Sequence, residues 1–275
     1  MAIAYPVLFG YLIGMITLAA QRAQQYLNAL RPILTPEAET VAGRLNRATR
    51  LNLWYATFVG IVIGLLNMDF ETVFGLRDTP GHAIDYGLSG TSLLIWTIIA
   101  RFTYLTARNA RVFSQLGELH TRVDLYRPST LRPFAQAGTL YLLIIMGALA
   151  LSPLQALDAS FRVDNYSWGF AIGVPAAIVL PLLTMHGIRK ATLVAKRAEL
   201  AQLDAAIAVA PRDLDASATQ TLNALLDRRA YVGEQHGWPM DVRMVSRAAF
   251  YVVIPPLAWV GAALVERAIE AFIGT

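Results

Sequence analysis

The chain has 275 residues, of which 56% are apolar and only 15% are charged, and its net charge is +4. A soluble domain carries about 25% charged residues, so this composition excludes an ordinary soluble protein and favours a membrane protein. The sequence contains no Cys, which excludes disulfides, thiol nucleophiles and thiolate metal sites.

Six long apolar stretches alternate with more polar connections along the whole chain. A helix that crosses a bilayer needs about 20 consecutive apolar residues, and each stretch is close to or above that length. We therefore predict an all-α fold: a polytopic membrane protein with about six transmembrane helices, arranged as three hairpins in a single domain over 1–275. The predicted spans are Ala2–Ala20, Leu51–Met68, Ile84–Leu105, Phe134–Leu154, Trp168–Ile188 and Ala248–Ile273.

The first stretch lacks the basic residues that precede the apolar core of a signal peptide, so we expect it to be retained. It carries a GxxxG motif at Gly10 and Gly14. Two glycines on one helix face favour close packing, either within the chain or between the copies of a homo-oligomer. We therefore assign Gly10 and Gly14 to helix packing.

The connection after the first stretch has the signature of a helix start. Thr35 can cap a helix, Pro36 suits its first position, and Glu37 places an acid in its first turn. We predict a helix that begins there and continues through Arg50 into the second stretch.

The second and third stretches supply candidates for packing and for a polar path. A second GxxxG motif, Gly60 and Gly64, lies in the second stretch, followed by Asn67 near its end. The third stretch contains Thr97 and Arg101. Polar groups in a membrane helix mark candidate solute paths, although Arg101 lies where its side chain can extend to the lipid headgroups. The helix has no breaker after Arg101 before Gly117 or Pro128, so we predict that it extends beyond the membrane.

The fifth and sixth stretches contain helix-distorting prolines. Gly169 and Gly173 form a third GxxxG motif in the fifth stretch. Proline inside a helix removes a backbone hydrogen bond, so these positions are candidate hinges or gates. They are Pro175 and Pro181 in the fifth stretch, and Pro255 and Pro256 in the sixth.

Residues 187–247, between the fifth and sixth stretches, have the pattern of a cytoplasmic helical hairpin. Leu193, Leu200 and Ile207 recur every seven residues, and Pro211 ends that pattern. A second apolar face runs from Leu222 to Val232. Two heptads are too few for a coiled coil, so an amphipathic pair packed on the other helices is favoured.

Charge predicts the orientation of the chain. The basic segments 21–50, 101–132 and 187–247 hold five, six and nine of the 23 Lys and Arg residues, whereas the opposite side has only Arg77, Arg162 and Arg267. Basic connections remain cytoplasmic, so both termini are expected on the periplasmic or extracellular side of a bacterial inner membrane. The basic pI is then explained without a nucleic-acid partner, and the lipid bilayer is the expected environment.

No motif for an enzyme emerges from the sequence. The four His residues, His82, His120, His186 and His236, are far apart, and Ser89 and Ser92 do not form a GxSxG motif. We therefore predict no catalytic, cofactor or metal site and expect no cofactor. Two functions remain open: a non-enzymatic scaffold or signalling component that binds a cytoplasmic protein through its helices, or an ion or small-solute channel or transporter.

Overall fold

The computed structural model describes residues 4–66, 82–151, 164–210 and 216–235, together with six single positions between 238 and 261. These residues form α-helices, two short 3-10 helices and no strand, so the predicted all-α fold is confirmed for the described part of the chain. The α-helices are α1 Ala4–Leu30, α2 Ala38–Ala42, α3 Arg50–Leu66, α5 His82–Leu119, α6 Arg132–Leu151, α7 Asp164–Val209 and α8 Ala216–Glu234.

Three of the described helices are long and apolar enough to cross a membrane. They include Pro6–Ile33 around α1, Pro128–Leu151 around α6, and Ala171–Val209 in α7. The predicted second span coincides with α3, which is apolar but only 17 residues long. The predicted third span lies in α5, and most of the predicted sixth span lies outside the described residues.

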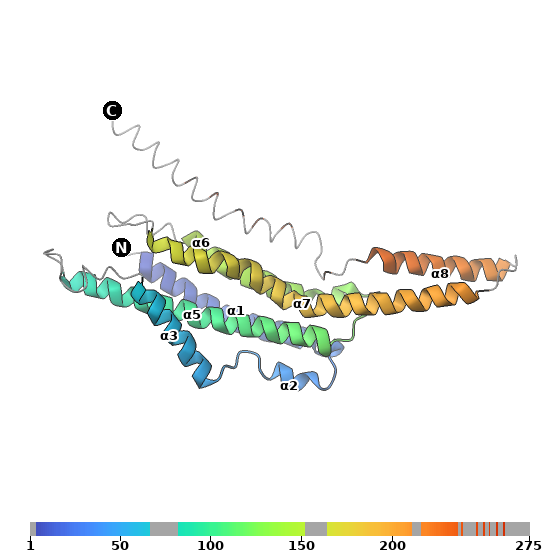
Figure 1. Ribbon diagram of the computed structural model, residues 1–275, viewed down its shortest axis with the longest axis horizontal. Helices are drawn as coiled ribbons and strands as arrows, with labels where there is room; N and C mark the ends of the chain where they lie inside the picture. Colours follow the sequence, from blue (N-terminus) through green and yellow to red (C-terminus); the bar gives the residue numbers. More distant parts are fainter. Residues whose placement is uncertain are drawn as a thin grey trace, which may run out of the picture.

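The helices form an elongated bundle in which α7 packs on both α5 and α6 (Figure 1). α1 packs on α6, and α3 packs on α5. Successive long helices reverse direction, so the connections from α1 to α3 and from α5 to α6 lie toward the same end of the bundle (Figure 1). The second half of α7 and the whole of α8 extend beyond that end.

The largest buried cluster lies at this end of the bundle rather than at the predicted membrane level. Phe113 of α5 and Phe134 of α6 meet edge to face, with their ring centroids 6.3 Å apart. Leu30 of α1 and Ile188 of α7 are fully buried in the same cluster, which also covers Ala38 of α2. Burial of this much apolar surface stabilises the connections at this end of the bundle and packs them against the long helices.

The continuous helix predicted beyond Arg101 is confirmed, because α5 continues to Leu119. The helix predicted from Thr35 through Arg50 is wrong. α2 ends at Ala42, and residues 43–49 form turns and coil before α3 begins.

Asn46 explains this break. Its φ of 56° is left-handed, which an α-helix excludes and which Asn tolerates better than most residues. Its backbone N–H donates to Asn109 Oδ1 at 3.0 Å, and Asn109 Nδ2 donates back to Asn46 Oδ1 at 2.7 Å. Asn46 Nδ2 also donates to the carbonyl oxygen of Ala20. These three hydrogen bonds replace the helical ones and attach the turn to α1 and α5.

Candidate functional site

The second half of α7, from residue 193, and α8 form a two-helix arm that projects from the bundle (Figure 1). The two helices run antiparallel, and Leu203 of α7 and Val232 of α8 are buried between them. Leu125, from the segment between α5 and α6, is buried in the same cluster. The base of the arm therefore packs on the connection that follows α5, whereas its tip does not.

Polar contacts fix the angle of the arm. Tyr126 stacks on Tyr231, with ring centroids 5.9 Å apart and an interplanar angle of 5°. Arg228 donates to Tyr126 Oη and to Glu199 Oε1, and these contacts raise the pKa of Arg228. Because Arg228 is exposed, this network contributes little to overall stability, but it sets the orientation of α8.

A lysine caps the end of α8. Lys196 Nζ donates to the carbonyl oxygen of Gly233 at 2.6 Å and to that of Gln235 at 2.8 Å. The last carbonyls of a helix have no partner within the helix, and a cation there also interacts favourably with the helix dipole. The sequence gives no indication that Lys196 supplies the cap.

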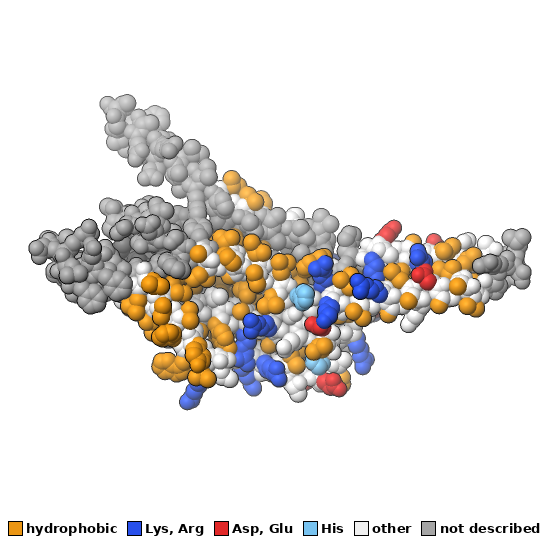
Figure 2. Space-filling model, viewed as in Figure 1, with side chains coloured by type: hydrophobic (Ala, Val, Ile, Leu, Met, Phe, Trp, Pro, Cys, Tyr) orange, Lys and Arg blue, Asp and Glu red, His pale blue; other side chains and the backbone are white. Residues whose placement is uncertain are grey.

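The arm exposes apolar side chains that its own packing does not use. Val209 is 85% exposed and Val194 is 59% exposed, and Leu226 is also exposed. Hydrophobic and basic side chains are interspersed along the visible face of the arm (Figure 2).

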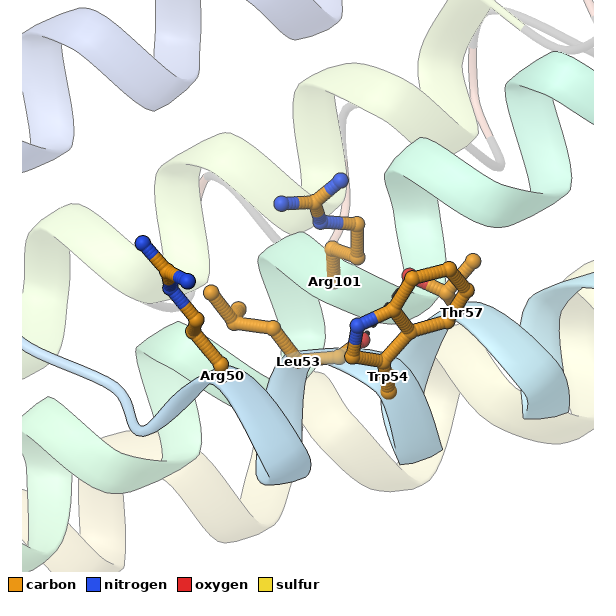
Figure 3. Close-up of a pocket in the computed structure, with 5 residues that line it drawn as sticks. All are labelled: Arg50, Leu53, Trp54, Thr57 and Arg101. Carbon is orange, nitrogen blue, oxygen red and sulfur yellow. Dashed lines mark hydrogen bonds between the residues drawn. The ribbon is translucent and has the colours of Figure 1, made fainter.

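Arg101 lies in a surface pocket of about 300 Å³ between α3 and α5. Arg50 and Trp54 of α3 line the same pocket, together with Leu53 and Thr57. The guanidinium groups of Arg50 and Arg101 extend to the same side of the two helices, and the indole of Trp54 lies toward Thr57 (Figure 3). An Arg pair with an aromatic neighbour is typical of an interfacial position rather than of a membrane interior.

The described residues of the predicted polar path do not line one cavity. Arg101 lines the pocket between α3 and α5. The backbone of Thr97 instead packs against Gly60, so closely that a Cβ atom added to Gly60 would lie only 2.6 Å from Thr97 Cα. Asn67 lies outside the described residues. A shared cavity for these three residues therefore stays a prediction.

The three GxxxG motifs have different surroundings. Gly60 and Gly64 lie against the backbone of α5, and a Cβ on Gly173 would contact Leu149 of α6. A Cβ on Gly10 or Gly14 would have no neighbour within 4 Å among the described residues. Gly169 lies in α7, but its surroundings are outside the described side chains.

Two of the candidate hinges lie inside a helix that the structure describes. Pro175 and Pro181 are interior positions of α7, which is continuous from Asp164 to Val209. Pro181 is buried, and its carbonyl oxygen would lie 3.1 Å from a Cβ on Gly138 of α6. Pro181 is therefore part of a close contact between two helices. Pro255 and Pro256 lie outside the described residues.

The tightest helix contact involves glycines that the sequence analysis did not select. A Cβ on Gly187 of α7 would lie 1.7 Å from the carbonyl oxygen of Ser114, and a Cβ on Gly117 of α5 would lie 2.6 Å from Ile188 N. Each helix contributes a single glycine, so a search for GxxxG cannot find this crossing. The pairing of Asn46 with Asn109 was missed for a similar reason, because the two residues are 63 positions apart.

The described residues contain no group of three His, Cys, Asp or Glu side chains that could hold a metal ion. His120 Nδ1 lies 3.4 Å from Thr35 Oγ1, which places it in a structural contact between two connections. No family model, curated protein or solved structure matches the chain. Function must therefore be argued from the residues themselves.

Proposed function

We propose that the chain is a multi-pass protein of the bacterial inner membrane that acts as a non-enzymatic scaffold or signalling component. In this proposal six spans form three hairpins, the basic connections and the arm are cytoplasmic, and both termini lie on the opposite side. The arm binds another protein or a second copy of the chain.

The distribution of exposed side chains supports the membrane part of this proposal. Trp54 of α3 is 71% exposed, Phe58 is 65% exposed, and Ile178 of α7 is 58% exposed. Figure 2 shows hydrophobic side chains over the left part of the described bundle, and Lys and Arg side chains from its middle toward the arm. An apolar surface at one end and a basic surface at the other are what a bilayer and the positive-inside rule require.

The orientation can be tested directly because the chain has no Cys. We expect Val209→Cys, at the tip of the arm, to react with a membrane-impermeant maleimide only after spheroplasts are permeabilised. Ser160→Cys, in the predicted outer connection, is the matched control and should react in intact spheroplasts. Reaction of Val209→Cys in intact spheroplasts would show that the arm is outside.

The length of α7 is the observation that carries the functional part of the proposal. Its 46 residues span roughly 69 Å at about 1.5 Å per residue, whereas the hydrocarbon core of a bilayer is about 30 Å thick. More than half of the helix is therefore not needed for crossing the membrane. That excess length, paired with α8, presents exposed apolar side chains well beyond the bundle.

A photocrosslinking amino acid tests whether the arm meets a protein. Benzoylphenylalanine in place of Val209 is expected to give one discrete protein adduct when the full-length protein is irradiated in its native membranes. The same amino acid in place of Phe58, on the exposed face of α3, should give no such adduct. Adding Leu226→Asp should weaken the adduct at position 209, because a charge on an apolar docking surface is costly to bury.

The absence of a discrete adduct at position 209 would contradict partner binding by the arm. Ion flux through liposomes that contain the purified protein would instead favour the channel or transporter. That alternative draws no specific support from Arg101 or Thr97, because the described residues do not place both in one pocket.

A further inference from the structure

We propose that the groove between α3 and α5 is a binding site for one anionic phospholipid. Three arginines, Arg44, Arg108 and Arg111, bind the phosphate group, and the apolar part of the groove holds an acyl chain. This inference rests on the proposed membrane location, but not on partner binding by the arm.

The headgroup end of the site is a pocket of about 400 Å³ at the junction of α5 with the turn before α3. Arg108 and Arg111 are three residues apart on α5 and therefore lie on one face of the helix. Arg44 enters from the turn between α2 and α3, and Tyr104 and Gln115 supply further polar groups. No acidic side chain lines the described pocket.

These arginines are available for a ligand. None of the three forms an ion pair with a described carboxylate, in contrast to Lys190, which pairs with Glu118, and Arg229, which pairs with Asp204. Arginine binds phosphate oxygens with a planar pair of donors, and three guanidinium groups around one cavity strongly favour an anion. The pocket therefore has the chemistry of a phosphate site.

The second part of the site is an apolar groove of about 380 Å³ next to the basic pocket. Tyr104 lines both cavities, so they are neighbours at this residue. Val59 of α3, Trp96 and Ile99 of α5 and Ile172 of α7 line the groove. From Trp96 to Tyr104 it follows α5 for roughly 12 Å at about 1.5 Å per residue.

The order of the two cavities selects a lipid over a free phosphate. The apolar groove lies along the predicted third span, and the basic pocket lies on the extension of α5 beyond it. A phospholipid in the cytoplasmic leaflet presents its acyl chains and phosphate in the same order. A soluble phosphate would leave the apolar groove empty, and a zwitterionic lipid would bring a cation next to three arginines.

The pair of Asn46 and Asn109 positions the third arginine. Asn109 follows Arg108 directly in α5, and its side chain holds the turn that contains Arg44 through two hydrogen bonds. Arg44 is thereby fixed on the same side of α5 as Arg108 and Arg111, and all three line one pocket. The left-handed Asn46 thus contributes to the site without lining the pocket.

Native mass spectrometry of the full-length protein in detergent tests this site with phosphatidylglycerol as the probe. We expect the triple variant Arg44→Gln, Arg108→Gln, Arg111→Gln to bind phosphatidylglycerol at least about tenfold more weakly than the wild-type protein, since each basic contact contributes appreciably to binding of anionic lipid. The matched control carries Arg122→Gln, Arg127→Gln and Arg197→Gln, which remove the same charge outside the pocket. Equal loss in both triple variants would overturn the proposal.

The groove is tested separately by Ala100→Phe, which fills it without changing the charge. We expect this variant to weaken binding of phosphatidylglycerol, whereas phosphatidylcholine should bind weakly to every variant. Glycerol phosphate and inorganic phosphate should compete only at far higher concentration than the lipid. Competition by either at the same concentration, or equal binding of phosphatidylcholine, would overturn the lipid assignment.

The membrane location has its own measurement. Carbonate washing of native membranes is expected to leave the wild-type protein and both triple variants in the pellet. Release of the wild-type protein would contradict the membrane location, whereas retention with unaltered lipid binding by the pocket variant would contradict the lipid site alone.

Discussion

Replacing Gly187 with Ala is expected to destabilise the bundle by about 3 kcal/mol, at the upper end of the usual cost of overpacking. The added Cβ would lie 1.7 Å from the carbonyl oxygen of Ser114, and at the same crossing a Cβ on Gly117 would lie 2.6 Å from Ile188 N. Both obstructing atoms belong to the backbone, so a change of rotamer cannot relieve the contact. α5 and α7 would have to separate along the bundle.

Thermal unfolding of the purified protein in detergent measures this effect. The midpoint should fall by roughly 5 to 10 °C in Gly187→Ala. Gly14→Ala is the matched control, because a Cβ there would have no described neighbour within 4 Å. Alanine is the better helix former by about 1 kcal/mol, so the control should be neutral or slightly more stable. Equal midpoints for the two variants would show that the α5–α7 crossing is not close-packed.

The contrast between these glycines shows what a motif can predict. GxxxG places two small residues on one face of a helix, but the position of the partner helix decides whether the face is used. Gly60 and Gly64 meet the backbone of α5, whereas Gly10 and Gly14 meet no described atom within 4 Å. The contact at Gly187 depends on a single glycine from each helix, and local sequence carries no information about which helices cross.

Helix length followed from the sequence wherever the chain contains no breaker. α5 extends past Arg101 to Leu119, and α7 extends to Val209, two residues before Pro211. The break before α3 did not follow, because Asn46 is compatible with a helix in isolation. Only its hydrogen bonds to Asn109 and Ala20, which are distant in sequence, stabilise the left-handed conformation.

The grouping of the arginines was likewise only partly predictable. Charge counting assigned Arg44 to one basic connection and Arg108 and Arg111 to another, and Arg108 and Arg111 are neighbours on a helix by their spacing. Their convergence with Arg44 depends on the turn at Asn46, which the sequence analysis predicted as helix. Because a helix was predicted where the turn at Asn46 lies, the pocket formed by the three arginines was not predicted either.

Substitution of Asn46 is the second change for which we expect a large effect. Asn46→Val should destabilise the protein by about 3 kcal/mol, because a β-branched residue is strained at a φ of 56° and the hydrogen bonds of the side chain are lost. Asn46→Gly, which adopts this φ without strain, should cost only about 1 kcal/mol for the lost hydrogen bonds. The difference between the two midpoints in thermal unfolding isolates the backbone strain.

Double variants of Asn46 and Asn109 test whether the turn at Asn46 only supports the fold or also positions Arg44 in the lipid site. Asn46→Gly and Asn109→Ala remove the same side-chain hydrogen bond, so their combined effect on stability should be smaller than the sum of the single effects. Asn223→Ala, on the exposed surface of α8, is the control for loss of an amide and should be additive with Asn46→Gly. If Asn46→Gly also weakens binding of phosphatidylglycerol while α5 keeps its protection from hydrogen exchange, the turn acts on the pocket through Arg44. Unchanged lipid binding would mean that Arg108 and Arg111 suffice, and that the left-handed turn only links α2 to α3.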